Sequence, residues 1–289
     1  MNRMGNFVAN HFNKILDRLF RSIDVTRILR TMNLRLIPDM DHRRGGKHAY
    51  AEWAHVIGLF QALIYQNLGK QDANVILDIG CGTGLLAIAS EPFLAGNSRY
   101  IGIDVGREDI EFCRKHYESP VFEFRHFDIS NPAYAPDQQK TRRSWPLMDS
   151  SVDLVTALSV WTHLNEQDAL FYMKEVSRVL RPGGKAIITF FVLDQTYRNT
   201  LGERADAPGR FHMTNQRDWI FDHAAYGSRK WFYPEWAPVA ESAIGITEDG
   251  MADLLAISGL EIVVNYPGNW KELPGLYFQD VVILQKPSA

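Results

Sequence analysis

The sequence predicts an α/β fold in which helices cover both faces of a mostly parallel sheet, and three observations lead to this prediction. Short apolar runs alternate with segments of helical periodicity from residue 74 to residue 192. The first run leads into a turn with three glycines, and the alternation stops at residue 194 before returning near residue 246. Strands that alternate with helices build a parallel sheet, so the pattern predicts a doubly wound sheet with one insertion.

Length and composition exclude several classes of protein. The 289 residues are 46% hydrophobic, which is enough for one large domain or a domain with an extension. Lys and Arg number 31 against 34 Asp and Glu, so no basic field favours a nucleic-acid partner. Two cysteines are too few for a disulfide framework or a cysteine zinc site. No apolar run approaches the roughly 20 residues that span a bilayer, and polar residues interrupt the N-terminal apolar stretch, so we expect a cytoplasmic protein without a membrane span.

Residues 1–72 precede the alternation and are expected to form an N-terminal helical cap. Phe7 to Leu29 and His48 to Asn67 both place apolar residues at helical spacing. The first of these helices has a basic polar side, which suits either an anionic membrane surface or packing on its own domain or on a second subunit. We favour packing, and a homodimer through the N-terminal helices is one form of it.

Residues 73–289 are expected to form a single domain that contains the alternating elements. The expected strands are 74–79, 100–103, 121–124, 152–157 and 186–192, and the expected helices are 85–93, 107–117 and 166–180. A helix at 248–258 and two further strands at 261–266 and 280–285 follow, and these last two are predicted to pair antiparallel at one sheet edge. The intervening stretch 194–245 has no regular pattern, which is typical of a lid or a binding loop.

The glycine turn indicates which ligand the domain binds. A buried strand ends in Asp78 and Ile79, and glycines follow at Gly80, Gly82 and Gly84. A dinucleotide fingerprint places its third glycine three positions after the second, whereas here the spacing is two. The turn therefore favours a smaller ligand without a pyrophosphate. A nicotinamide oxidoreductase is disfavoured for the same reason.

Acidic residues follow the next two strands. Asp104 ends the second strand, where a carboxylate accepts hydrogen bonds from ribose hydroxyls. Asp128 and Ile129 follow the third strand and pair a polar group with an apolar one, as the edge and face of a purine require. Taken together in this order, the three strand ends predict a nucleoside site.

With these motifs the chain resembles the class I S-adenosylmethionine-dependent methyltransferases, of the small-molecule type. The resemblance is dense from residue 73 to 193 and looser over 261–285, and its segments are 77–84, Asp104, Phe127–Asp128, 145–147, 149–155, 161–164 and 180–184. It implies a Rossmann-like seven-stranded sheet with an antiparallel edge strand. It also implies S-adenosylmethionine as the cofactor.

The resemblance also assigns cofactor residues. Asp78 and the backbone at Gly80 and Gly82 would hold the methionine part, Asp104 the ribose, and Asp128 with Ile129 the adenine. Further cofactor positions are Cys81, Gly84, Val105, Leu158 and Tyr50. Cys81 is interpreted first as a small buried filler of the turn. Tyr50 and Arg44 belong to an N-terminal segment that related enzymes use as a flap, and a solvated basic loop is the alternative.

His163, which follows the fourth strand, is the candidate catalytic residue. A base is needed when a hydroxyl is methylated, and a histidine titrates near neutral pH. The alternative is a structural role, in which His163 shapes the cofactor pocket or caps the following helix. Asp153 and Asp194 are carboxylates that a metal would require, but their spacing gives no support for a cluster, so no metal is predicted.

The insertion carries the clue to the acceptor. Eight aromatic residues crowd into residues 211–236: Phe211, Trp219, Phe221, Tyr226, Trp231, Phe232, Tyr233 and Trp236. They line a substrate pocket or pack the insertion, and the sequence does not separate the two. The expected function is methyl transfer to a small-molecule acceptor, at a hydroxyl of a natural product or saccharide. The alternatives are N-methylation of a small amine and a noncatalytic cofactor-binding scaffold.

Overall fold

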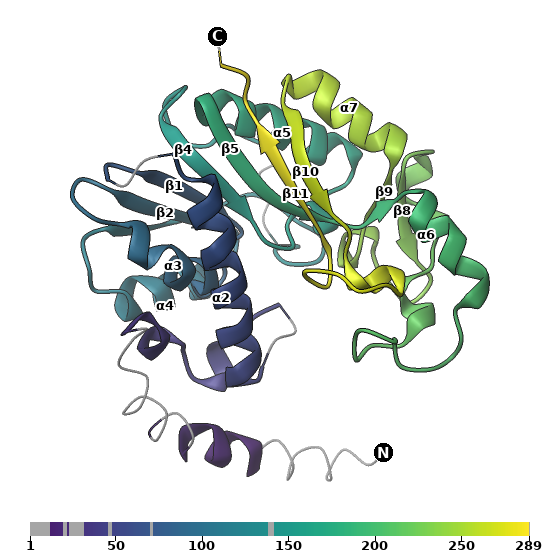
Figure 1. The fold of residues 1–289 in the computed structure, drawn as a ribbon, viewed down its shortest axis with the longest axis horizontal. Coiled ribbons are helices and arrows are strands. Elements are labelled where there is room, and N and C mark those ends of the chain that lie inside the picture. Colours follow the sequence, from purple (N-terminus) through teal and green to yellow (C-terminus); the bar gives the residue numbers. More distant parts are fainter. Residues whose placement is uncertain are drawn as a thin grey trace.

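A seven-stranded sheet forms the centre of the molecule (Figure 1). The computed structural model describes residues 12–19, 22, 32–45, 48–69, 72–137 and 142–288. The strand order is β10-β11-β5-β4-β1-β2-β3, with bounds β1 Val75–Ile79, β2 Arg99–Asp104, β3 Phe122–His126, β4 Val152–Ala157, β5 Leu180–Phe190, β10 Glu261–Tyr266 and β11 Asp280–Gln285. Pairing is parallel from β3 to β5, and β11 runs antiparallel to both β5 and β10. The predicted Rossmann-like sheet is confirmed, with its antiparallel strand one position in from the edge.

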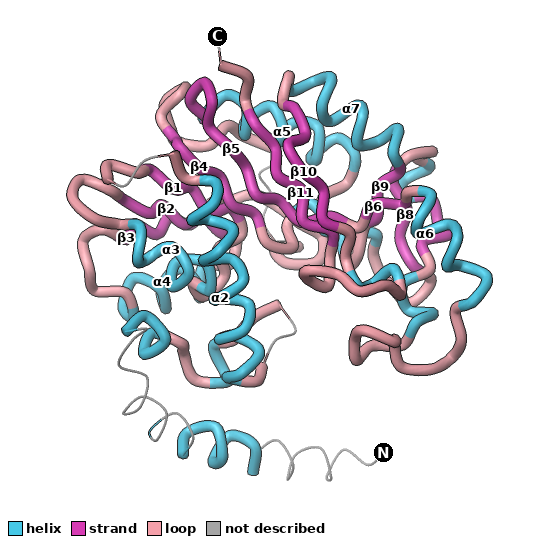
Figure 2. The backbone as a smooth tube through the Cα atoms, viewed as in Figure 1, coloured by secondary structure: helices cyan, strands magenta, loops and turns pink. Residues whose placement is uncertain are grey.

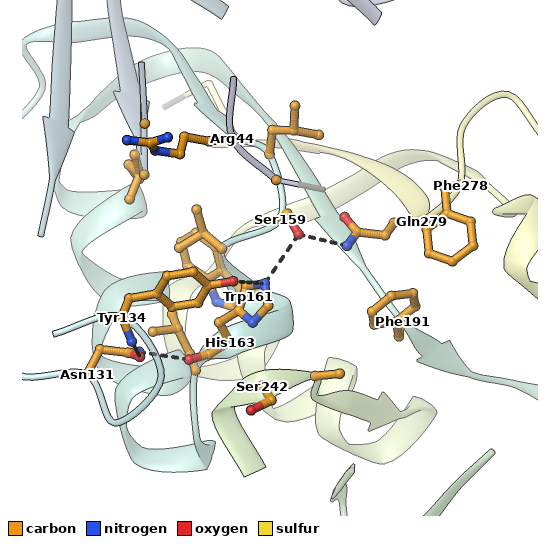
Figure 3. Close-up of a pocket in the computed structure, with 18 of the residues that line it drawn as sticks. Arg44, Asn131, Tyr134, Ser159, Trp161, His163, Phe191, Ser242, Phe278 and Gln279 are labelled. Atoms are coloured by element: carbon orange, nitrogen blue, oxygen red, sulfur yellow. Dashed lines mark hydrogen bonds between the residues drawn. The ribbon is translucent and has the colours of Figure 1, made fainter. Parts of the chain in front are cut away.

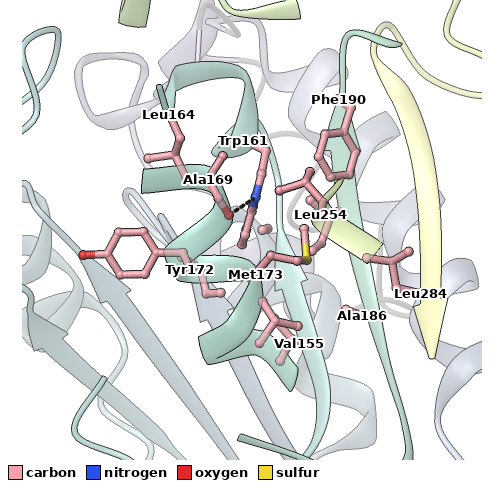
Figure 4. Packing of buried hydrophobic residues seen from close by; sticks show 14 of the residues in the cluster. Val155, Trp161, Leu164, Ala169, Tyr172, Met173, Ala186, Phe190, Leu254 and Leu284 are labelled. Atoms are coloured by element: carbon pink, nitrogen blue, oxygen red, sulfur yellow. Dashed lines mark hydrogen bonds between the residues drawn. The ribbon is translucent and has the colours of Figure 1, made fainter. Parts of the chain in front are cut away.

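Helices cover the two faces of this sheet. The helices are α2 Tyr50–Asn67, α3 Leu85–Ser90, α4 Arg107–His116, α5 Glu166–Val179 and α7 Glu248–Ser258. Neighbouring strand residues point to opposite faces, so Leu77 and Val155 pack in the cluster with α5 and α7, whereas Ile76 and Leu154 pack with α2, α3 and α4. Figure 4 shows part of the first cluster, in which Met173 of α5 and Leu254 of α7 meet the sheet.

The insertion is more regular than the sequence predicts. Helix α6 Gln195–Thr200 and strands β7 Phe221–Ala224 and β8 Trp231–Pro234 lie within it. The two strands β7 and β8 join β6 Val192–Leu193 and β9 Gly245–Thr247 in a second sheet of order β6-β9-β8-β7, which lies beside the large sheet (Figure 2). The prediction of an irregular stretch is wrong because these strands have two to four residues each, too few to show an alternation.

Short 3₁₀ helices connect these elements. They are η1 Met32–Leu36, η2 Met40–His42, η3 Glu91–Phe93, η4 Trp161–His163, η5 Leu201–Glu203, η6 Gln216–Trp219, η7 Ala225–Gly227, η8 Ala240–Ser242 and η9 Asn269–Lys271. The predicted helix at 85–93 is thus α3 continued by η3. The predicted fifth strand at 186–192 is the second part of β5 followed by β6.

The N-terminal cap joins the main core where it is described. Residues 12–19 are helical, and Arg43 forms a buried bidentate ion pair with Asp17 of that helix, at 2.8 and 3.0 Å. Most of the predicted helix at 7–29, and with it the predicted dimer contact, lies outside the described residues. Helix α2 shares the cluster of the sheet, with Trp53, Ile57 and Phe60 buried. Among the helices that the structure describes, none has the length and apolar character to cross a membrane.

Candidate active site

A cavity of about 1390 Å³ opens at the carboxyl ends of β1, β2 and β4. The chain leaves β1 for α3 on one face and β4 for α5 on the other, so the two adjacent strands form the switch point of the sheet, where open α/β sheets bind ligands. Pockets for one drug-sized ligand measure about 300–1,000 Å³. The cavity therefore has room for two ligands. We call the end beside Gly80, Gly82 and Asp104 the cofactor half, and the end beside Phe191, Trp219 and Phe278 the acceptor half.

Two glycines bring the backbone up to the cofactor half. Gly80 and Gly82 have φ angles of +66° and +49°, a region that side chains strain to occupy. A Cβ atom on Gly80 would lie 2.5 Å from Cγ2 of Val160, whereas a Cβ on Gly82 would meet only Arg44, at 3.7 Å or more. The wall at Gly82 is thus bare backbone. A side chain there would fill the space that a ligand needs.

Asp104 completes the cofactor half from the end of β2. Its two carboxylate oxygens accept the N–H groups of Gly82, at 2.8 Å, and Gly106, at 2.7 Å. Burial raises the pKa of Asp104, and these two N–H groups oppose that effect. Each oxygen keeps a lone pair for a further donor, such as a ribose hydroxyl. Val105, Ile129 and Leu158 supply apolar contacts on the same wall, so the residues present fit a nucleoside with a short polar arm.

The structure places five of the predicted cofactor residues away from the cavity wall: Asp78, Cys81, Gly84, Asp128 and Tyr50. Asp78 lies beneath the turn, where its carboxylate accepts hydrogen bonds from the hydroxyls of Tyr100 and Thr156 and burial raises its pKa to about 7. Gly84 begins α3, and a Cβ there would lie 2.4 Å from the hydroxyl of Tyr117. Asp78 and Gly84 thus support the turn from beneath, and direct cofactor contacts from all five positions stay predictions.

The predicted flap is held by charge pairing. Arg44 forms hydrogen bonds with both carboxylate oxygens of Asp109 on α4, at 2.7–3.1 Å, and it lines the cavity beside Gly82. Thr83 donates its hydroxyl proton to the carbonyl of His42 and fixes the segment to the glycine turn. The segment is thus fixed at two points, and Arg44 itself is exposed, so its role as a flap stays a prediction.

His163 reaches the cavity from η4, which buried Trp161 anchors. The indole Nε1 of Trp161 donates to the carbonyl of Ala169 on α5, as Figure 4 shows. Nδ1 of His163 donates to the carbonyl of Glu241 at 2.7 Å, so Nε2 carries the lone pair. Burial lowers the pKa of His163 to about 4 and keeps the ring neutral near pH 7. The alternative of a helix cap is wrong, because Asn165 caps α5 by accepting the N–H of Asp168.

The lone pair of His163 meets two hydroxyls (Figure 3). Nε2 lies 3.1 Å from the hydroxyl of Tyr134 and 3.4 Å from that of Ser159. The amide of Gln279 donates to Ser159 at 2.8 Å, and Thr189 donates to Gln279 at 2.7 Å. Sequence reasoning missed Thr189 and Gln279 because they come from β5 and from the segment before β11, far from His163 in the sequence. The signal present was a polar residue, Thr189, inside an apolar strand.

Three aromatic rings form a wall on the acceptor half. Phe191, Trp219 and Phe278 have ring centroids 4.9 to 5.9 Å apart. Of the eight aromatics in the insertion, Phe211 and Trp219 line the cavity, whereas Phe221 and Trp231 are buried in the core. Both interpretations of the cluster therefore hold for part of it. Phe191 and Phe278 lie outside residues 211–236 and were missed.

The two carboxylates considered for a metal lie apart. Asp153 pairs with Arg181 and Asp194 pairs with Lys271 at 2.8 Å. Within the described part of the chain, no group of three or more His, Cys, Asp or Glu side chains is arranged to hold a metal ion.

The comparison with protein families matches the part of the chain that runs from β1 into β5. Residues 77–188 match the family model described as a methyltransferase domain. Methyltransferase GfsG of Streptomyces halstedii is 29% identical over 145 residues, which are 50% of this chain and 46% of that protein. An O-methyltransferase of Pyrenophora dematioidea is 34% identical over 119 residues, 41% of this chain and 40% of that one. The chain thus spans less than half the length of these curated relatives.

A solved structure extends the likeness to most of the fold. The SAM-dependent methyltransferase from Methanosarcina mazei matches with a TM-score of 0.51 and 22% identity, over 78% of this chain and 98% of that one. A likeness at this identity shows the fold alone. The family match and the shared fold meet on β1 to β5, the strands whose ends build the cavity.

Proposed function

Residues 77–188 form a methyltransferase domain of the class I, S-adenosylmethionine-dependent fold, and we propose that the chain methylates a hydroxyl of a small-molecule acceptor. The acceptor class we propose is a natural product or a saccharide. One observation carries the proposal: a single cavity joins Gly82 and Asp104 at one end to Nε2 of His163 at the other. A methyl donor and an acceptor hydroxyl would thereby share one cavity.

The cofactor half would hold S-adenosylmethionine through backbone and carboxylate contacts. Gly82 would admit the methionine arm against bare backbone, and Asp104 would accept the ribose hydroxyls. Val105 and Ile129 would pack on the adenine. When bound, the cofactor supplies an electrophilic methyl group on its sulfonium. The protein then acts chiefly by positioning, because holding two reactants together removes much of the barrier to their reaction.

His163 would take the hydroxyl proton of the acceptor at Nε2. The carbonyl of Glu241 fixes the tautomer, so the lone pair points to the cavity whenever the ring is neutral. Its pKa of about 4 makes His163 a weak base. Proton transfer would therefore accompany methyl transfer, since the hydroxyl becomes more acidic as its oxygen bonds to carbon. Tyr134, whose hydroxyl meets Nε2, would give up this place to the acceptor.

Oxygen is favoured over nitrogen as the methylated atom by the relatives and by the site. The relative from Pyrenophora dematioidea is named an O-methyltransferase. A hydroxyl has to lose a proton to a base, and His163 supplies a neutral nitrogen at the cavity.

Cofactor titration and acceptor screening test the proposal. Asp104→Ala should weaken S-adenosylmethionine binding by roughly 1–3 kcal/mol, because charge-assisted hydrogen bonds are lost. Asp72→Ala, which removes an exposed carboxylate outside the cavity wall, is the control. Unchanged affinity in Asp104→Ala would refute the ribose role.

Radiolabelled methyl transfer to a panel of alcohols, phenols and amines should label the hydroxyl compounds. Labelling of amines alone would contradict O-methylation, and cofactor binding without any labelled product would favour the noncatalytic scaffold.

A further inference from the structure

We infer that the acceptor half selects an uncharged compound with a planar ring and rejects ammonium and carboxylate compounds of the same size. The inference rests on the proposed function and names the substrate class of the same cavity. Two features of the acceptor half carry it. One wall is aromatic, and the charged side chains that line the cavity are already paired or stand at its open rim.

The aromatic wall is backed by further rings that hold it in place. Phe191 is 3% exposed, and its ring lies 5.2 Å from that of Phe221 and 5.0 Å from that of Trp270. Phe278 and Trp219 meet edge to face at 4.9 Å. In Figure 3, Phe191 and Phe278 lie across Ser159 from Tyr134, so an acceptor at His163 would extend toward the rings. A fixed wall of aromatic rings favours a flat apolar ligand.

Glu272, which contacts His212 of the cavity wall, is a carboxylate held by protein partners. Oε1 of Glu272 lies 2.7 Å from Nε2 of His212, and Oε2 accepts the backbone N–H of Arg210 at 2.9 Å. Nδ1 of His212 contacts the hydroxyl of Thr214, which in turn accepts the indole N–H of Trp219. The Glu272 side chain is 2% exposed. Because it is buried and does not line the cavity, Glu272 is out of reach of an ammonium group of a ligand.

The remaining charged groups of the described wall belong to the cofactor half or to the rim. Arg44 pairs with Asp109 at 2.7 Å and Arg142 with Asp168 at 3.2 Å. Glu52 and His55 line the cavity from the exposed side of α2, where water screens them. A charged ligand against Phe191 and Phe278 would lose its hydration without gaining an oppositely charged partner. A cation–π contact with the rings returns less free energy to an ammonium group than the burial of its charge costs. An uncharged ring loses little hydration there.

A matched set of probes tests this selectivity. 2-Naphthol, 2-naphthoate and 2-naphthylmethylammonium carry one ring system with charge 0, −1 and +1. Their dissociation constants are measured by calorimetry on the full chain at neutral pH, with and without saturating S-adenosylhomocysteine. 2-Naphthol should bind at least about 10-fold more tightly than either charged probe. A charged probe that binds within 10-fold of 2-naphthol, or more tightly, would overturn the inference.

The two measurements separate this inference from the proposed function. If S-adenosylhomocysteine does not bind while the order of the probes is kept, the cofactor assignment fails and the acceptor inference stands. If S-adenosylhomocysteine binds and the order of the probes is lost, the cofactor assignment stands and the acceptor inference fails.

A variant places a charge on the wall to invert the preference. Phe211 lines the cavity and is 43% exposed, so Phe211→Lys adds a cation without opening the core. Naphthoate affinity should rise about 10-fold in this variant, with 2-naphthol changed less than about threefold. Met148→Lys is the control, since Met148 is 75% exposed and away from the cavity wall. No gain in Phe211→Lys, or an equal gain in Met148→Lys, would contradict the inference. Tight binding of the ammonium probe that Glu52→Gln abolishes would also contradict the inference. In that case Glu52 at the open rim of the cavity would set the selectivity.

Discussion

The two halves of the cavity are built in different ways. The polar groups of the cofactor half are backbone and short side chains that directly follow β1 and β2, within about thirty residues of sequence, and Ile129 and Leu158 add apolar contacts from the ends of β3 and β4. The acceptor half brings together the ends of β4 and β5, the insertion and the segment before β11. A site made from turn geometry is visible in the local sequence. A site made from distant side chains exists only once the sheet has ordered those segments.

The first way to break this comparison is to change the backbone of the cofactor half. Gly80→Ala should weaken S-adenosylmethionine binding roughly 1,000-fold, about 4 kcal/mol, because the new Cβ both strains a φ of +66° and collides with Val160. Gly58→Ala is the matched control, since a Cβ there meets nothing within 4 Å. Calorimetric titration measures both. Equal affinities in the two variants would show that the turn does not hold the cofactor.

His163 makes a prediction about pH that concerns stability alone. Its pKa is about 4 in the folded protein and 6.5 as an ordinary value, so between these values the unfolded chain takes up a proton that the folded chain does not. The contribution of His163 should therefore be lost as pH falls from 6.5 to 4, by roughly 3 kcal/mol at most. Urea unfolding of the wild type and of His163→Asn across this window measures it.

Asp78 contributes a pH dependence of stability with the opposite sign, and this contribution has to be separated from that of His163. Burial raises its pKa from 3.8 to about 7, so its contribution is lost as pH rises through that range. Both proteins in the comparison keep Asp78, and the difference between them isolates His163. A difference that does not change between pH 6.5 and 4 would contradict a buried neutral histidine.

The effect of His163→Asn on turnover distinguishes the acceptor half from the cofactor half. His163→Asn should lower kcat about 100-fold with cofactor affinity unchanged, because the proton acceptor belongs to the acceptor half. Single-turnover methyl transfer, together with cofactor titration, separates the two quantities. A fall in cofactor affinity with kcat kept would place His163 in the cofactor half and give it a structural role.

Tyr134 should give the smallest effect. Tyr134→Phe removes the hydroxyl at Nε2 of His163 but keeps the edge-to-face contact of the two rings, whose centroids lie 4.8 Å apart. We expect kcat to change by no more than about threefold, since the acceptor would displace that hydroxyl. A loss comparable to that in His163→Asn would show that Tyr134 itself takes part in proton transfer.

Much of the fold could be predicted from the sequence because its elements are long enough to show a period. β4, α7, β10 and β11 lie within the predicted bounds, and the glycine spacing indicated the cofactor half. The second sheet could not be predicted, because strands of two to four residues leave no pattern. Direct contacts from Asp78 and Gly84 stay predictions, since in the structure Asp78 accepts a hydrogen bond from Thr156 and Gly84 lies against Tyr117.

The acceptor half shows the limit of local sequence reasoning most clearly. His163 was identified from its place after a strand, whereas Gln279, which fixes Ser159 beside it, lies 120 residues further along the chain than Ser159. The pairing of Glu272 with His212 likewise spans 60 residues. Such contacts depend on tertiary structure, and a single sequence carries no signal for them.

Calorimetric titration of the wild-type chain with S-adenosylmethionine, run beside NAD as a competitor, tests the central claim most directly. We predict one cofactor bound per chain for S-adenosylmethionine and no measurable heat for the dinucleotide, because the spacing of Gly80, Gly82 and Gly84 departs from the dinucleotide fingerprint. Measurable affinity for the dinucleotide with none for S-adenosylmethionine would contradict the account.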